Sequence, residues 1–174
     1  RRGVRCHSFE PASAIRLRLV WNVDANDLTE FIRIYPYAVA GARGTLELHR
    51  GTSSVHSSLF GNQQVNDVVS EPVEVITFGD AVQMMGEPNI DLLKIDIEGA
   101  EILAFKGMQN IFKDSPPKII VSEVSHLPDC LMTPVELIKY IEGCGYLSYR
   151  IRNEGLHRYK IGESLHPDYD ANIA

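Results

Sequence analysis

The 174-residue sequence is 44% hydrophobic and 23% charged, a balance that suits one globular domain with a sizeable core. A formal net charge of −6 argues against a nucleic-acid-binding surface, and no apolar run reaches the ~18 residues that a membrane helix needs. Three cysteines without C-x-x-C spacing, Cys6, Cys130 and Cys144, argue against a disulfide scaffold and favour a reducing, cytoplasmic setting.

The first part of the chain alternates strand patterns with one helical pattern. "VRCHSF" (4–9) predicts a short strand, and "ASAIRLRLVWNVDAN" (12–26) has apolar residues at helical spacing. "FIRIYPYAV" (31–39) and "TLELH" (45–49) predict two strands joined by the turn "AGARG". Residues 51–72 are rich in Ser, Asn and Gln without periodicity, which predicts a long loop.

The middle of the chain predicts two strands, each followed by a helix. "VEVIT" (73–77) is a strand pattern whose last residue, Thr77, can cap the next helix with Asp80 as its return partner. Residues 90–95 are apolar and are soon followed by Gly99, which predicts another strand. From Gly99 onward the apolar residues recur at helical spacing.

The last part of the chain predicts a strand, a helix and a hairpin. "PKIIVSEV" (117–124) is an apolar strand pattern. "TPVE" (133–136) combines a capping Thr, Pro at the first helical position and Glu three residues after the cap. "GYLSYRI" (145–151) and "LHRYKI" (156–161) predict a hairpin, and the polar tail from Gly162 is expected to be frayed.

Strands that alternate with helices predict an α/β fold, in which helices cover both faces of a mostly parallel sheet and an antiparallel hairpin ends the chain. We expect one domain over residues 1–161 and a polar tail over 162–174. Ligands of such open sheets bind beyond the carboxyl ends of the strands. Because Glu10, Asp96 and Glu123 lie at predicted carboxyl ends of strands, we expect a site at that edge.

The positions of four acidic residues and one histidine near these strand ends indicate what their side chains can do. Glu10 is either an exposed acid at a strand end or an acceptor of hydrogen bonds from ribose hydroxyls, whereas Glu101 is expected to stabilise a helix N-terminus. Asp96 and Glu98 lie between strand and helix, where a carboxylate can bind an ammonium group, a hydroxyl or a metal. His126 is either a general base or a surface histidine. Asp96, Glu98 and His126 could together bind a divalent ion, although no metal-ligand spacing supports one.

The segment "IDLLKIDIEGAEILAFKGM" (90–108) resembles the signature of the FkbM-type methyltransferases, which use S-adenosylmethionine and have a Rossmann-like fold. "HSFEP", "LVWNVDAN" and "YAVAGARGTLELH" resemble earlier segments of that family. "VEVITFGDAV", "KIIVSEVSH" and "ELIKYIEGCGY" resemble later ones in the same order. The resemblance extends to about Arg152 and implies a doubly wound, Rossmann-like domain.

The same resemblance implies that the protein transfers a methyl group from S-adenosylmethionine, commonly to a hydroxyl oxygen of a small molecule or sugar. Glu10 would match the acid that binds the cofactor ribose, and Tyr37 and Ala38 would lie near the adenine. Asp96 would match the acid near the methionine part of the cofactor. Asp96, Glu98 and His126 are the candidates for base or orienting roles.

Two features depart from the family pattern. Phe78-Gly79 stands where the family commonly has Leu-Asp, and Asp80 follows one place later. The family also opens with a strand and a glycine-rich turn, for which too few residues precede Glu10. The missing strand would lie between the strands that end at Glu10 and Asp96. We therefore expect an open or rearranged sheet, weak cofactor binding and a strand edge prone to self-association.

The sequence leaves three functions open. The first is methyl transfer, and the second is a non-catalytic remnant or partner-binding domain of the same fold. The third is a metal-assisted enzyme that uses Asp96, Glu98 and His126. Titration with S-adenosylmethionine and then with Mg²⁺ distinguishes them, because each function predicts a different pattern of binding.

Overall fold

The computed structural model describes residues 3–51, 57–58, 68–97, 100–124, 132–163 and 172–173. The strands are β1 (Cys6–Phe9), β2 (Ile32–Tyr35), β3 (Ala38–Ala40), β4 (Gly44–Gly51), β5 (Ser57–Ser58), β6 (Val68–Thr77), β7 (Leu92–Ile95), β8 (Ile119–Glu123), β9 (Tyr149–Arg152), β10 (Gly155–Arg158) and β11 (Asn172–Ile173). The helices are α1 (Ser13–Ala25), α2 (Phe78–Met85), α3 (Glu101–Lys106), α4 (Gln109–Asp114) and α5 (Pro134–Gly143). In the described ranges, no helix is long and apolar enough to cross a membrane.

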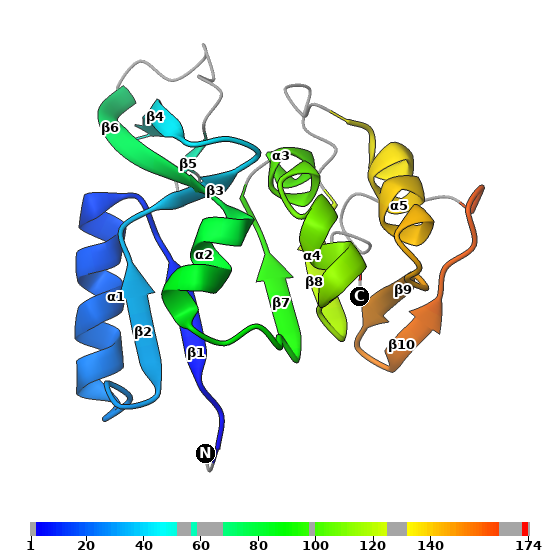
Figure 1. The fold of residues 1–174 in the computed structure, drawn as a ribbon, viewed down its shortest axis with the longest axis horizontal. Helices are drawn as coiled ribbons and strands as arrows, with labels where there is room; N and C mark the ends of the chain where they lie inside the picture. The colour runs from blue at the N-terminus through cyan, green and yellow to red at the C-terminus, as the bar shows by residue number, and fades with distance from the viewer. Residues whose placement is uncertain are drawn as a thin grey trace.

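The described strands form three sheets. β1 and β2 are a parallel pair. The largest sheet has the order β10-β9-β11-β8-β7, in which β7 and β8 are parallel and β9 and β10 form an antiparallel hairpin. β3 is parallel to β6 in the third sheet, where β6 also pairs with the antiparallel β4 (Figure 1). The β1–α1–β2 and β7–α3–α4–β8 crossovers confirm the predicted α/β fold with its C-terminal hairpin.

The main core lies where helices pack on one face of β7 and β8. Figure 1 shows α4 in front of β8 and β7 beside it. Phe105 and Met108, in and just after α3, are fully buried. The other buried members of this core come from α2, α3, β7, β8 and α5: Phe78, Ile95, Ile102, Ala104, Ile120 and Leu137. The signature segment 90–108 therefore supplies both the strand β7 and a helix of the same core.

Two helices begin with the caps that the sequence predicted. The Thr77 hydroxyl accepts the N–H of Asp80, while the Asp80 carboxylate accepts the N–H of Thr77. Thr133 and Glu136 form the same reciprocal pair at α5, with Pro134 at its first turn. Each pair satisfies backbone donors that a helix start leaves unpaired, so both helix starts are fixed by local sequence.

A close backbone contact divides the helix predicted after Gly99 into α3 and α4. Gly107 lies between them and packs on the turn after β3. A Cβ on Gly107 would lie 2.8 Å from the Ala40 carbonyl oxygen and 3.2 Å from the Gly41 Cα. Only glycine permits such an approach, because any side chain would overlap backbone atoms.

The predicted single strand over residues 31–39 is wrong. The segment forms β2 and β3, which belong to different sheets. Pro36 lies at the break, where its ring fixes φ and removes a backbone donor. The chain therefore leaves the pair with β1 after Tyr35 and joins β6 from Ala38 onward.

Two other expectations need correction. The loop predicted over 51–72 is wrong at its end, because β6 begins at Val68 and pairs with β4 from there. It is also wrong at Ser57–Ser58, which pair with β4 as β5. The tail expected to be frayed contributes β11, which lies between β8 and β9. A two-residue strand in a polar segment has no periodicity, so only its long-range partners reveal it.

Candidate functional site

The strands that end at Glu10 and Asp96 run in the same direction, and Figure 1 shows β1 between β2 and β7. Their carboxyl ends therefore lie at one edge of the molecule. Among the described strands, β1 pairs with β2 alone and β7 with β8 alone, so the two belong to separate sheets. This arrangement agrees with the expected open sheet. It brings Glu10 and Asp96 to one edge without joining their strands.

The Glu10 side chain turns back on the loop that follows β1. Its carboxylate accepts the N–H of Ala12 at 2.8 Å. The Arg16 guanidinium donates to the carbonyls of Glu10 and Pro11 at 2.9 and 2.7 Å. These bonds hold the loop against the first turn of α1. The carboxylate is thereby oriented at the strand end.

Glu71 is a residue that sequence reasoning missed. The N-cap position of α1 is Ala12, which has no side-chain acceptor. Both carboxylate oxygens of Glu71, in β6, lie 3.3 Å from the N–H of Ser13 in the first turn. An acid at this position also complements the positive end of the helix. The two residues are 58 positions apart, so no local pattern could have shown the contact.

Asp96 is exposed and ion-paired. Its carboxylate lies 2.6 Å from the Lys94 Nζ, and 42% of its side chain is exposed. An exposed pair of this kind adds little stability, so Asp96 is not required for the fold on this ground. Glu101, in contrast, is buried in the first turn of α3 and accepts the N–H of Ile97 at 3.0 Å. Glu101 therefore has the structural role at the helix start that the sequence predicted.

Tyr37 and Ala38 follow the carboxyl end of β2. Because β1 and β2 are parallel, and the Glu10 N–H donates to the Tyr35 carbonyl at 3.0 Å, these residues lie at the same edge as Glu10. Ala38 opens β3 opposite Val75 and is buried in a small apolar cluster. A ligand at this edge would therefore meet the Tyr37 ring or the backbone, and not the Ala38 methyl group.

Of the three remaining candidates, Glu123, Glu98 and His126, the structure describes only Glu123. Glu123 ends β8 and pairs with Asn172 of β11. Glu98 and His126 lie outside the described residues, so their geometry is undefined. Within the described ranges, no group of three His, Cys, Asp or Glu side chains is placed to hold a metal ion. Two of the three residues in the metal hypothesis, Glu98 and His126, lie outside these ranges.

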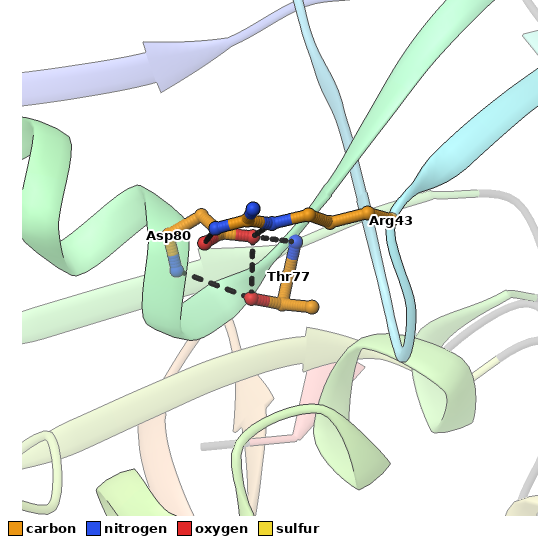
Figure 2. A network of polar contacts seen from close by, with 3 residues as sticks. All are labelled: Arg43, Thr77 and Asp80. Carbon is orange, nitrogen blue, oxygen red and sulfur yellow. Dashed lines mark hydrogen bonds and ion pairs between the residues drawn. The ribbon is translucent and has the colours of Figure 1, made fainter.

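Asp80 belongs to a polar network, shown in Figure 2, that ties the β3–β4 turn to α2. The Arg43 Nε donates to Asp80 Oδ2 at 2.9 Å, and a second guanidinium nitrogen bonds Oδ1. The Thr77 N–H and hydroxyl donate to the same carboxylate at 2.9 and 2.7 Å. The Arg43 bond, and then those from Thr77, hold the pKa of the Asp80 carboxyl well below its usual range. Asp80 is thus a structural residue. The sequence showed its cap but not its partner Arg43.

Comparison with known proteins relates this chain to one protein family and to one solved structure. A family model described as the methyltransferase FkbM domain matches residues 1–148. Among solved structures, the chain is similar to the methyltransferase FkbM from Methylobacillus flagellatus KT, with 16% sequence identity and a TM-score of 0.54. The similarity covers 97% of this chain and 36% of that one, so this chain spans about a third of its structural neighbour. No curated protein matches the chain.

Proposed function

Because this chain belongs to the FkbM methyltransferase domain family, we propose that it acts in S-adenosylmethionine-dependent methyl transfer to a hydroxyl oxygen of a small molecule or glycan. The family match over residues 1–148 carries this proposal. The common edge at the ends of β1, β2 and β7 supports it, because ligands of open α/β sheets bind at such edges.

The residues at this edge fit the proposed cofactor. Glu10 would accept hydrogen bonds from the ribose hydroxyls, because its carboxylate is an acceptor held at the end of β1. Tyr37 would contact the adenine, and Asp96 would hold the ammonium group of the methionine part. When bound, S-adenosylmethionine supplies a methyl group on a positively charged sulfur.

The chain's own task would be to align the acceptor hydroxyl and to remove its proton. Asp96, Glu98 and His126 are the proposed base or orienting residues. Asp96 is exposed at the strand end, where it can reach a ligand, although Lys94 competes for its carboxylate. Alignment of two reacting groups lowers the activation free energy by several kcal/mol, and by about 7–11 kcal/mol when the groups are well oriented.

One observation favours a second candidate function, that of a non-catalytic, partner-binding domain. β1 and β7 are not joined in the described structure, so the ends that carry Glu10 and Asp96 are not held by a continuous sheet. A site built from both strands is less preorganised than one on a single sheet.

Asp91, at the start of β7, is a matched control for Asp96 at the end of the same strand. Asp91 precedes β7 and pairs with Lys118 at 2.6 Å, and Asp96 follows β7 and pairs with Lys94 at 2.6 Å. We expect Asp96→Asn to reduce methyl transfer from radiolabelled S-adenosylmethionine, and Asp91→Asn to leave it unchanged. Equal activity of both variants would remove Asp96 from the site. Absence of transfer, and of cofactor binding by calorimetry, in the unsubstituted protein would favour the non-catalytic function.

The cysteines support the proposed cytoplasmic setting. Cys6 and Cys144 are free thiols in the described structure, and Cys130 lies outside it. Free thiols persist in reducing compartments, where disulfides are rare. Alkylation of all three thiols in protein isolated without reductant is the expected result.

A further inference from the structure

The hairpin of β9 and β10 lies at the end of the molecule opposite α1 (Figure 1). One of its faces belongs to the core, because Tyr159, just after β10, is fully buried in a cluster with Val124 and Ile138. Side chains alternate between the two faces of a strand, so the residues next to Tyr159 and their register partners share the other face. We call this other face the hairpin surface, which consists of Tyr149, Ile151, Leu156 and Arg158.

The aliphatic side chains of the hairpin surface are exposed to solvent. Ile151 and Leu156 are register partners, and 38% and 62% of their surfaces are exposed. Leu147 and Ile161, just outside the two strands, are 59% and 43% exposed. Large apolar side chains that gather at one end of a molecule indicate a surface that binds an apolar partner.

Two cations lie beside these aliphatic side chains. The Arg158 guanidinium lies 5.5 Å from the centre of the Tyr149 ring and donates to the Ser148 carbonyl at 3.4 Å. Lys160 follows two positions later and is exposed. In the part of the chain that the structure describes, neither side chain forms an ion pair with a carboxylate. Both positive charges are therefore available to an anionic partner.

The hairpin has the opposite charge to the protein as a whole. Residues 147–160 contain four cations, Arg150, Arg152, Arg158 and Lys160, and only one acid, Glu154, whereas the whole chain has a formal net charge of −6. An anionic surface therefore attracts this end of the molecule and repels most of the rest. Two copies that met through the hairpin surface would bring their unpaired cations together, so charge repulsion disfavours a second copy as the partner.

We propose that the hairpin surface binds an anionic lipid membrane, with Ile151 and Leu156 inserted among the headgroups and Arg158 and Lys160 against lipid phosphates. Aliphatic side chains beside cations suit such a membrane, because apolar burial and charge attraction add to each other. Nucleic acid fits less well, since bases stack on open aromatic rings and the Tyr149 ring is covered by Arg158. The hairpin surface contains none of the proposed site residues, so this contact does not depend on methyl transfer.

Co-sedimentation with lipid vesicles tests the proposal. We expect the protein to bind phosphatidylcholine vesicles that contain phosphatidylserine, and to bind pure phosphatidylcholine vesicles much more weakly. Binding should decrease as the salt concentration rises, because salt screens the attraction between the cations and the lipids. Leu156→Ser should weaken binding roughly tenfold, since it removes an inserted apolar side chain. Lys160→Gln should weaken it roughly fivefold, which is the effect of one cation near an anionic membrane.

Leu92→Ser and Lys118→Gln are the matched controls. Leu92, in β7, is 59% exposed and so resembles Leu156. Lys118 is an exposed lysine like Lys160, but it forms a 2.6 Å ion pair with Asp91. Each control makes the same substitution as its counterpart, and the two lysine variants change the net charge equally. Both controls should bind the vesicles as the unsubstituted protein does, and circular dichroism should show that all four variants are folded.

Two results would overturn the proposal. The first is the absence of binding to phosphatidylserine vesicles, or binding that the hairpin variants and the controls change equally. The second is a dimer in analytical ultracentrifugation that Leu156→Ser dissociates, because a second copy would then cover the hairpin surface.

Discussion

Gly107→Ala tests the contact between the α3–α4 junction and the turn after β3. Gly107 has φ of −69°, so its backbone conformation suits alanine. The obstacle is space, because a Cβ would lie 2.8 Å from the Ala40 oxygen and 3.2 Å from both the Ala104 oxygen and the Gly41 Cα. All three are backbone atoms, which cannot rotate away as the end of a side chain can. The junction or the turn must therefore shift.

Two opposing effects determine how much Gly107→Ala changes the free energy of unfolding. Without a clash, Gly→Ala at such a backbone conformation stabilises by about 0.4–1 kcal/mol, because it restricts the unfolded chain. Overpacking a close contact costs about 1–3 kcal/mol. We expect the clash to dominate and Gly107→Ala to lose about 1–2 kcal/mol of unfolding free energy. For a chain of this size, the melting temperature would fall by roughly 2–8 °C.

Gly143→Ala is the matched control. Gly143 is the last residue of α5, and a Cβ there would meet no atom within 4 Å. Alanine should therefore stabilise this position by about 0.5–1 kcal/mol. Urea unfolding followed by circular dichroism measures both variants. If Gly107→Ala were as stable as Gly143→Ala, the close contact between Gly107 and Ala40 would be refuted.

Three further predictions concern a carboxylate, a cap and the cofactor. Because the pKa of Asp80 is lowered from 3.8, its stabilising effect is complete above that value and declines at lower pH. Asp80→Asn should therefore flatten the fall of the urea midpoint below pH 4. Thr133→Ala should cost about 1 kcal/mol in the same assay, because α5 loses its capping hydroxyl. Calorimetry should show weak binding of S-adenosylmethionine to the 174-residue chain, since β1 and β7 are not joined, and micromolar affinity would contradict this.

Features that depend on neighbouring residues could be predicted from the sequence. Thr77 with Asp80, and Thr133 with Glu136, place both partners of a cap within four residues. The strand of the signature segment is similarly local, because a short apolar run soon followed by glycine indicates a strand. The β2–β3 break could also have been read from Pro36, whose effect on a strand is known.

Contacts between distant residues could not be predicted in this way. Arg43 and Asp80 are 37 positions apart, and Glu71 caps α1 from 58 positions away. β11 has only two residues and exists through its pairing with β8 and β9. Each depends on how the whole chain folds, and none leaves a periodic pattern. For the candidate site, the sequence indicated the common edge of Glu10 and Asp96 but not the ion pair of Asp96 with Lys94.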